Sequence, residues 1–149
     1  MVRGRQVYVR ACQSCHGAGE KHVAWAQAWQ QGGAASAPVG AAASAPRDVG
    51  LAVDFRAAGA KGEVEVCAAC HSRRSELTPT PMAGEPLLDN YLPARLTPGL
   101  YHADGQQRDE VYVYGSFRQS RMYAYGVRCT DCHSAHTGKL KLPGNAVCL

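Results

Sequence analysis

Three copies of one five-residue pattern hold most of the reactive side chains of this sequence. Each copy reads Cys-x-x-Cys-His, and together they use six of the seven cysteines and three of the six histidines. The nine positions are Cys12, Cys15 and His16, then Cys67, Cys70 and His71, then Cys129, Cys132 and His133. Two thiols three positions apart lie on one face of a helical turn, where both can reach the same edge of a flat ligand. The pattern is the covalent attachment motif of c-type haem.

Each residue type of the motif has a task in that chemistry. The two thiols form thioethers with the two vinyl groups on one edge of the porphyrin, and the adjacent histidine supplies the proximal imidazole to the iron. The sequence therefore predicts three covalently bound haem c groups.

Other roles for the cysteine pairs fit less well. A zinc site needs two pairs at a compact spacing, but the pairs here begin 55 and 62 positions apart. A thioredoxin-like dithiol needs one motif in a βαβ context rather than three motifs. A disulfide framework leaves the histidine after every pair unexplained.

The three remaining histidines, His22, His102 and His136, match the number of open axial positions. Three haems with two axial ligands each need six ligands, and the chain has six histidines. The predicted iron ligands are therefore His16, His71 and His133 on one side and His22, His102 and His136 on the other. The alternatives are that a remaining histidine is an ordinary surface or core residue, or that Met82 or Met122 is a sixth ligand.

Spacing also predicts that ligands cross between haems. His136 follows His133 by three positions and His22 follows His16 by six. A porphyrin separates its two axial sides, so such a short segment cannot easily bind both faces of one haem. We therefore expect His136 and His22 to bind neighbouring haems, which must then lie close together.

Composition limits the remaining classes of protein. The chain has 149 residues, a formal charge of +4, and only two Phe and two Trp, so a conventional apolar core is thin. No apolar run approaches the roughly 20 residues of a membrane span, and residues 1–10 lack the apolar stretch of a secretory signal. The basic residues are scattered, which argues against nucleic acid as a partner.

The elements that position these residues are predicted to be mainly helical. We expect helices over Glu20–Trp29, Glu63–Leu77 and Asp104–Tyr125, and strand-like alternation only at Val111–Val113. The Gly/Ala/Ser/Pro-rich residues 31–46 form a low-complexity loop or linker. The expected fold class is a mainly α, loop-rich single domain over residues 1–149, with a core dominated by haem.

Several side chains near the motifs have two interpretations. Trp25 and Trp29 lie one helical turn apart and either cover a porphyrin or pack on a helix face. Arg73 and Arg74 either pair with haem propionates or are a solvated basic pair. Gly115 marks either a kink or a place where something flat packs closely.

The chain resembles multihaem c-type cytochromes of the hydroxylamine oxidoreductase and cytochrome c nitrite reductase superfamily. It is most similar to the periplasmic members that are associated with tetratricopeptide repeats. The resemblance rests on Cys15–Gly17, His22–Ala26, Cys67–Arg74, Tyr101–Arg108, Tyr114–Phe117, Gln119–Ser120, Cys129–His136 and Gly138–Leu140. It covers most of the chain outside residues 31–46.

The resemblance implies that a histidine shortly after a motif binds another haem, which supports His22 and His136. It supports His102 less, because relatives place a histidine after the Met-Tyr pair, where this chain has Ala124. Gly144–Leu149 resembles the opening of a fourth motif, so we expect the chain to be an internal piece of a longer cytochrome. The alternative is that Cys148 is a lone cysteine at a genuine end.

Three functions are consistent with these features. The first is an electron carrier with mostly bis-His haems, in which no residue is catalytic. The second is a fragment or subunit of a reductase or oxidase of small nitrogen or sulfur compounds, which needs an open iron and a distal group such as Arg118 or Tyr123. The third is a cytochrome subunit of a polymer or membrane-bound complex. The expected partners are redox proteins, further haem domains or neighbouring subunits, and the expected location is periplasmic or extracellular.

Overall fold

The computed structural model of the protein describes residues 11–31 and 49–148. About 46% of it is helical and 11% is strand, and the rest is loop. The mainly helical, loop-rich fold class is therefore confirmed. The described residues form two compact units, and the expected single domain over residues 1–149 stays a prediction. The predicted loop at 31–46 lies outside the described residues except for Gln31.

The first unit holds the described residues up to Ala58 together with Met82–Gly84. It contains a helical segment over 11–16 and α2 (Glu20–Gln30), so the helix expected over 20–29 is confirmed. The returning chain packs against the turn between them, where the Val53 N–H donates to the His16 carbonyl over 3.2 Å. Gly17 has φ 71° there, and a Cβ on it would lie 2.7 Å from the Ala52 Cβ. The turn therefore requires glycine.

The second unit holds Gly59–Pro81 and the residues from Glu85 onward. The helix α3 (Phe55–His71) is broken at Gly59, where φ is 65° and ψ is −174°, and the part from Gly59 onward is the main helix of this unit. The helix expected over Glu63–Leu77 is wrong beyond His71. The Ser72 hydroxyl donates to the Ala68 carbonyl over 2.7 Å, and the chain then leaves the helix.

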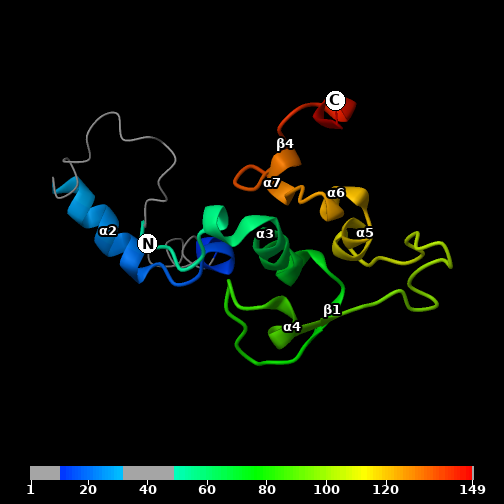
Figure 1. The fold of residues 1–149 in the computed structure, drawn as a ribbon. Coiled ribbons are helices and arrows are strands. Elements are labelled where there is room, and N and C mark those ends of the chain that lie inside the picture. The colour runs from blue at the N-terminus through cyan, green and yellow to red at the C-terminus, as the bar shows by residue number, and fades with distance from the viewer. Residues whose placement is uncertain (1–10, 32–48, 149) are drawn as a thin grey trace, which may run out of the picture. The chain divides into compact units, whose positions relative to one another are not determined.

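Two short antiparallel strands follow α3. They are β1 (Arg74–Glu76) and β2 (Tyr91–Pro93), and α4 (Leu87–Asn90) directly precedes β2. In the register, Ser75 lies opposite Leu92. Figure 1 shows this pair with α4 on one side of α3, and α5 to α7 on another.

The core of the second unit forms where these elements meet α3. Its buried members are Val64, Ala68, Leu87, Tyr91 and Tyr114, and Ala69, Phe117, Tyr123 and Cys129 pack against them. Each helix and strand from α3 to α7, apart from β1, contributes at least one side chain to this cluster. The core is small, as the composition predicts, and two of its five buried members are tyrosines.

The single helix expected over Asp104–Tyr125 is wrong. Only α5 (Tyr114–Arg118) and α6 (Arg121–Ala124) form within it. The Asp104 carboxylate accepts from the Gln106 N–H over 3.0 Å and so holds a tight turn where the helix is expected to begin. The short α6 has its own N-cap, because the Ser120 hydroxyl accepts from the Tyr123 N–H.

The strand expected at Val111–Val113 is also absent. Val111 is 1% exposed, and its carbonyl accepts from the Arg73 N–H, whereas Tyr112 has a φ of 58° that no strand allows. For Gly115 the sequence left open a kink or a closely packed flat group. The structure has the second, because the Tyr101 phenol packs directly against Gly115.

The chain ends in small elements around the third motif. They are α7 (Cys129–Cys132), the two-residue strands β3 (His133–Ser134) and β4 (Lys139–Leu140), and a 3-10 helix over Gly144–Cys148. The strands pair as a hairpin with His133 opposite Leu140.

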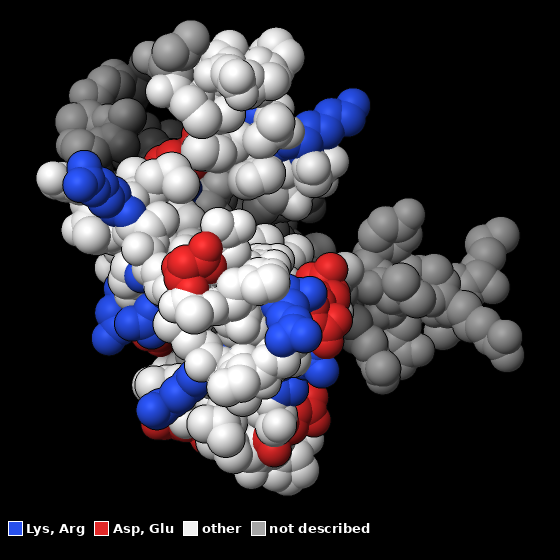
Figure 2. Space-filling view, turned by 90° about the vertical axis from the view of Figure 1, so that its right-hand side faces the viewer, with Lys and Arg blue, Asp and Glu red and all other residues white. Residues whose placement is uncertain are grey.

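The face drawn in Figure 2 is mixed in charge. Lysine and arginine lie interspersed with aspartate and glutamate on the face seen in Figure 2. Among the described residues, no helix has the length and apolar character needed to cross a membrane.

Candidate haem-binding motifs

The first motif lies in the helical segment over 11–16. Cys12 and Cys15 are exposed and share one face of that segment because they are three positions apart. The His16 ring is half-buried and meets the Phe55 ring edge-on, with ring centroids 5.2 Å apart. The thiols are thus accessible while the imidazole is held by packing.

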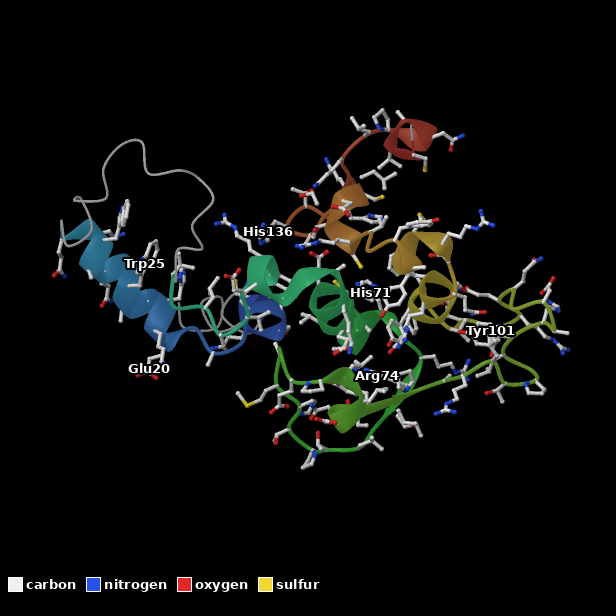
Figure 3. All side chains as sticks on the ribbon, viewed as in Figure 1. Glu20, Trp25, His71, Arg74, Tyr101 and His136 are labelled. Atoms are coloured by element: carbon white, nitrogen blue, oxygen red, sulfur yellow. The ribbon has the colours of Figure 1, made fainter. Side chains whose placement is uncertain are left out.

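The second and third motifs occupy the last turn of α3 and the single turn of α7. Both cysteine pairs are helical. His71, which Figure 3 labels, is exposed at the end of α3, and His133 is exposed directly after α7. The two motifs are separated by 62 positions in the sequence, and the fold of the second unit brings them into contact.

Glu63 makes that contact. Its side chain belongs to α3, one turn before Cys67, and the residue is 1% exposed. Its carboxylate accepts from the Thr130 N–H over 2.8 Å and from the Thr130 hydroxyl over 3.0 Å. Arg128 lies 3.9 Å from the same carboxylate. The buried Glu63 carboxylate therefore accepts a backbone N–H from the first turn of α7 and holds α7 against α3.

The thiols of Cys67 and Cys129 meet beside this junction. The Cys67 thiol hydrogen-bonds to Cys129, and this bond lowers the pKa of the Cys129 thiol below its ordinary value, because it favours the thiolate. Both residues are half-buried. The first cysteine of the second motif and the first cysteine of the third are therefore neighbours.

His22 is held in one tautomer when neutral. Its Nδ1 lies 2.7 Å from the Val49 carbonyl oxygen, which can only accept, so Nδ1 carries the proton. The ring also stacks on Trp25, at 5.5 Å and 18°, and Trp25 in turn lies 5.7 Å from Trp29. In the neutral ring the lone pair is on Nε2, which is the arrangement that metal-ligating histidines commonly have.

The remaining expected ligands, His102 and His136, are exposed in turns. The His102 N–H bonds the Gln106 carbonyl, and His136 lies in the turn of the β3–β4 hairpin. Among the described residues, no group of three or more His, Cys, Asp or Glu side chains is arranged to hold a bare metal ion. Within the second unit, the structure thus brings Cys67 of the second motif next to Cys129 of the third.

The two arginines after the second motif are engaged in the protein. Arg73 donates to the Asp109 carboxylate over 2.9 Å and to the Glu110 carbonyl over 3.1 Å. Arg74 donates to the Ala69 carbonyl and lies over the Tyr91 ring, 4.1 Å from its centroid. Neither interpretation from the sequence includes these contacts, which anchor the end of α3.

Arg118 and Tyr123, named as distal groups for an enzyme, lie together. The Arg118 guanidinium is 5.1 Å from the Tyr123 ring centroid, and it donates to the Tyr114 hydroxyl over 3.1 Å. Met82 and Met122 are at least half exposed.

The described residues fit covalently bound haem in three respects. All three cysteine pairs lie in helical turns, none of the seven cysteines forms a disulfide, and none of the three adjacent histidines is buried. One contact has to change on attachment, because a thioether sulfur carries no proton for the Cys67 to Cys129 hydrogen bond.

Sequence reasoning did not find Glu63. The available signal was a glutamate among valines, in Glu63-Val64-Glu65-Val66, one helical turn before a motif. Its partner Thr130 lies 67 positions away, and no local pattern identifies such a pair.

Comparisons with protein-family models, with curated proteins and with solved structures find no significant match to this chain.

Proposed function

We propose that the protein is an electron-transfer c-type cytochrome with three covalently attached haems. One observation carries the proposal: three Cys-x-x-Cys-His motifs are present, each with its cysteine pair in a helical turn and with no disulfide. The resemblance to multihaem cytochromes of the hydroxylamine oxidoreductase and nitrite reductase superfamily agrees with it.

The residues divide the work as follows. When bound, each haem supplies a one-electron change at its iron. The six motif cysteines hold the groups in place, and His16, His71 and His133 are the proximal ligands. His22, His102 and His136 are proposed as the ligands on the opposite faces. Two imidazoles per iron leave no open position for a substrate, which favours electron transfer over catalysis.

His22 has the best support among the second ligands. Its bond to the Val49 carbonyl fixes the tautomer, and stacking on Trp25 restrains the ring. Both features are typical of an imidazole that presents Nε2 to a metal.

The junction between the second and third motifs also supports the proposal. An electron carrier needs short distances between its redox groups. Glu63 fastens the helix of the third motif to that of the second, and Cys67 meets Cys129. Attachment at these two motifs would therefore occur at neighbouring positions.

We further propose a periplasmic or extracellular location, where haem is attached to such motifs, and redox proteins or further haem domains as partners.

The test is expression with an export signal and the haem-attachment machinery. The intact mass should exceed that of the polypeptide by three haems, and electron paramagnetic resonance of the oxidised protein should show only low-spin iron. A Cys12→Ala/Cys15→Ala variant should lose one haem, whereas Cys148→Ala should keep all three. A mass equal to the bare polypeptide would overturn the proposal. A high-spin signal with ready carbon monoxide binding would favour the reductase or oxidase instead.

A further inference from the structure

The contact between Cys67 and Cys129 joins two thiols that belong to different motifs. Each motif supplies its own nearer partner, since Cys70 and Cys132 lie three positions away from them. The fold nevertheless pairs the first cysteine of one motif with the first cysteine of the next.

We infer that Cys67 and Cys129 are the site of a specific disulfide in the haem-free chain. This cross-link would tie α3 to α7 and close a loop of about 60 residues.

Three features of the structure hold the two thiols together. Glu63 fixes the first turn of α7 through two hydrogen bonds to Thr130, the residue after Cys129. Cys129 packs against the buried cluster that includes Val64 and Ala68 of α3, which lie three positions before and one position after Cys67. The thiols themselves are in hydrogen-bonding contact, and a disulfide requires the two sulfurs to come to about 2.05 Å.

The reaction is ordinary thiol–disulfide exchange with a disulfide oxidant such as oxidised glutathione. The Cys129 thiolate attacks one glutathione sulfur, forms a mixed disulfide and releases one glutathione thiolate. The Cys67 thiolate then attacks the Cys129 sulfur and releases the second. The two protons lost by the cysteines end on the two glutathione thiols. The hydrogen bond from Cys67 favours the attacking thiolate at Cys129.

An unfolded chain would form a different bond. Loop closure costs less for the short Cys67 to Cys70 and Cys129 to Cys132 loops than for a loop of about 60 residues. If the chain forms the Cys67 to Cys129 bond in preference to the two short-loop bonds, the second unit must therefore be folded as described here.

The inference has a consequence that rests on the proposed function. A sulfur in a disulfide cannot form a thioether, so the cross-link would block haem attachment at the second and third motifs together. Reduction would have to come first. The first motif would remain competent.

The experiment uses the full 149-residue chain made without haem-attachment machinery, reduced and then equilibrated with a glutathione buffer. After quenching with acid and alkylation, tryptic peptides 62–73 and 129–139 are examined by mass spectrometry for a cross-link. Two matched double variants locate the bond. Cys70→Ser/Cys132→Ser should retain the cross-link, and Cys67→Ser/Cys129→Ser should reduce it at least about tenfold.

Two further arms separate fold from composition. Glu63→Gln should lower the yield of the cross-link in the otherwise unchanged chain, and a urea concentration that unfolds the chain should abolish the preference. If Cys67–Cys70 and Cys129–Cys132 bonds dominate without urea, or if the two double variants cross-link equally, the inference is wrong. Because no haem is present, either result leaves the haem proposal untouched, and a failure of haem attachment leaves this result untouched.

Discussion

The contacts of His22 indicate its function more clearly than those of the other proposed second ligands. A carbonyl bond at Nδ1 and a stacked indole restrain the ring of a half-buried side chain on a helix whose other residues are not buried. An ordinary surface histidine needs neither restraint. In Figure 3, Trp25 projects from the side of α2 opposite to Glu20, so the His22 and Trp25 pair marks one face of this helix.

Replacing His22 by Ala should therefore change one haem in the loaded protein. One of the three irons should lose one of its two imidazole ligands and show a high-spin signal in electron paramagnetic resonance, because the alanine side chain has no nitrogen to bind the iron. Lys21→Ala, on the same helix, should leave the spectrum unchanged. An unaltered low-spin spectrum in His22→Ala would assign the ligand elsewhere.

Asp109 provides a pH-dependent contact at the end of α3. Its carboxylate accepts from the Glu110 N–H over 2.8 Å and from Arg73 over 2.9 Å, and these bonds lower the pKa of Asp109 below its ordinary value of 3.8. A lowered pKa means that folding favours the ionised form. The contribution to stability is therefore complete above 3.8 and is lost as the pH falls through the lowered pKa.

Arg73→Gln should raise the pKa of Asp109 part of the way back to 3.8. The return is partial because the backbone bond from Glu110 is the larger cause and remains. Carboxyl chemical shifts in an NMR titration of the haem-free chain measure it, with Arg95→Gln as the control that leaves the value unchanged. An unchanged pKa in Arg73→Gln would show that the guanidinium contributes nothing in solution.

At the scale of elements, sequence patterns correctly predicted a helix whose ends depend on residues that are close in the sequence. The helix at Glu20–Gln30 agrees with the helix expected over Glu20–Trp29 and begins just after the turn at Gly17. The expected helix over 104–125 failed because its residues bond to distant ones instead. The Val111 carbonyl takes the Arg73 N–H, and Tyr101 fills the space beside Gly115. Helical propensity cannot report such tertiary contacts.

The junction of α3 with α7 depends on the buried Glu63 carboxylate, whose burial no local sequence pattern predicts. Glu63→Gln keeps the shape of the side chain but sets an amide where two Thr130 donors and Arg128 converge. We expect a loss of about 1.5–3 kcal/mol in the free energy of unfolding, because hydrogen bonds to a charged group are lost or weakened. Urea unfolding of the haem-free chain, followed by circular dichroism, measures it.

The matched control is Glu76→Gln in β1, an exposed glutamate. It should change the free energy of unfolding by no more than about 0.5 kcal/mol. Equal unfolding midpoints for the two variants would mean that Glu63 does not hold the two motifs together.

For the molecule as a whole, the sequence predicted the kind of structure better than its organisation. The motifs, the helical class and the thin core follow from residue types alone. The division at Gly59 and the pairing of Cys67 with Cys129 depend on long-range packing, which spacing does not encode. Close approach of the second and third motifs agrees with the expectation of closely packed haems, which stays a prediction.

The described residues bury few large apolar side chains and expose many. Leu88, Leu92 and Leu96 are each more than half exposed, whereas much of the second unit's core is tyrosine and valine. Such a chain gains little from burial of its own surface. Three covalently held porphyrins would add large apolar bodies against which these side chains can pack. We therefore expect the loaded protein to unfold at a clearly higher urea concentration than the haem-free chain.

That comparison tests whether haem completes the fold. Both forms are unfolded in urea under reducing conditions, so that no disulfide contributes, and backbone circular dichroism follows the transition. The Cys12→Ala/Cys15→Ala variant, with one haem fewer, should fall between the two forms, because each porphyrin adds its own contacts. Equal midpoints for loaded and haem-free protein would mean that the haems lie on the surface of a chain that is already complete, and that the exposed leucines serve some other contact.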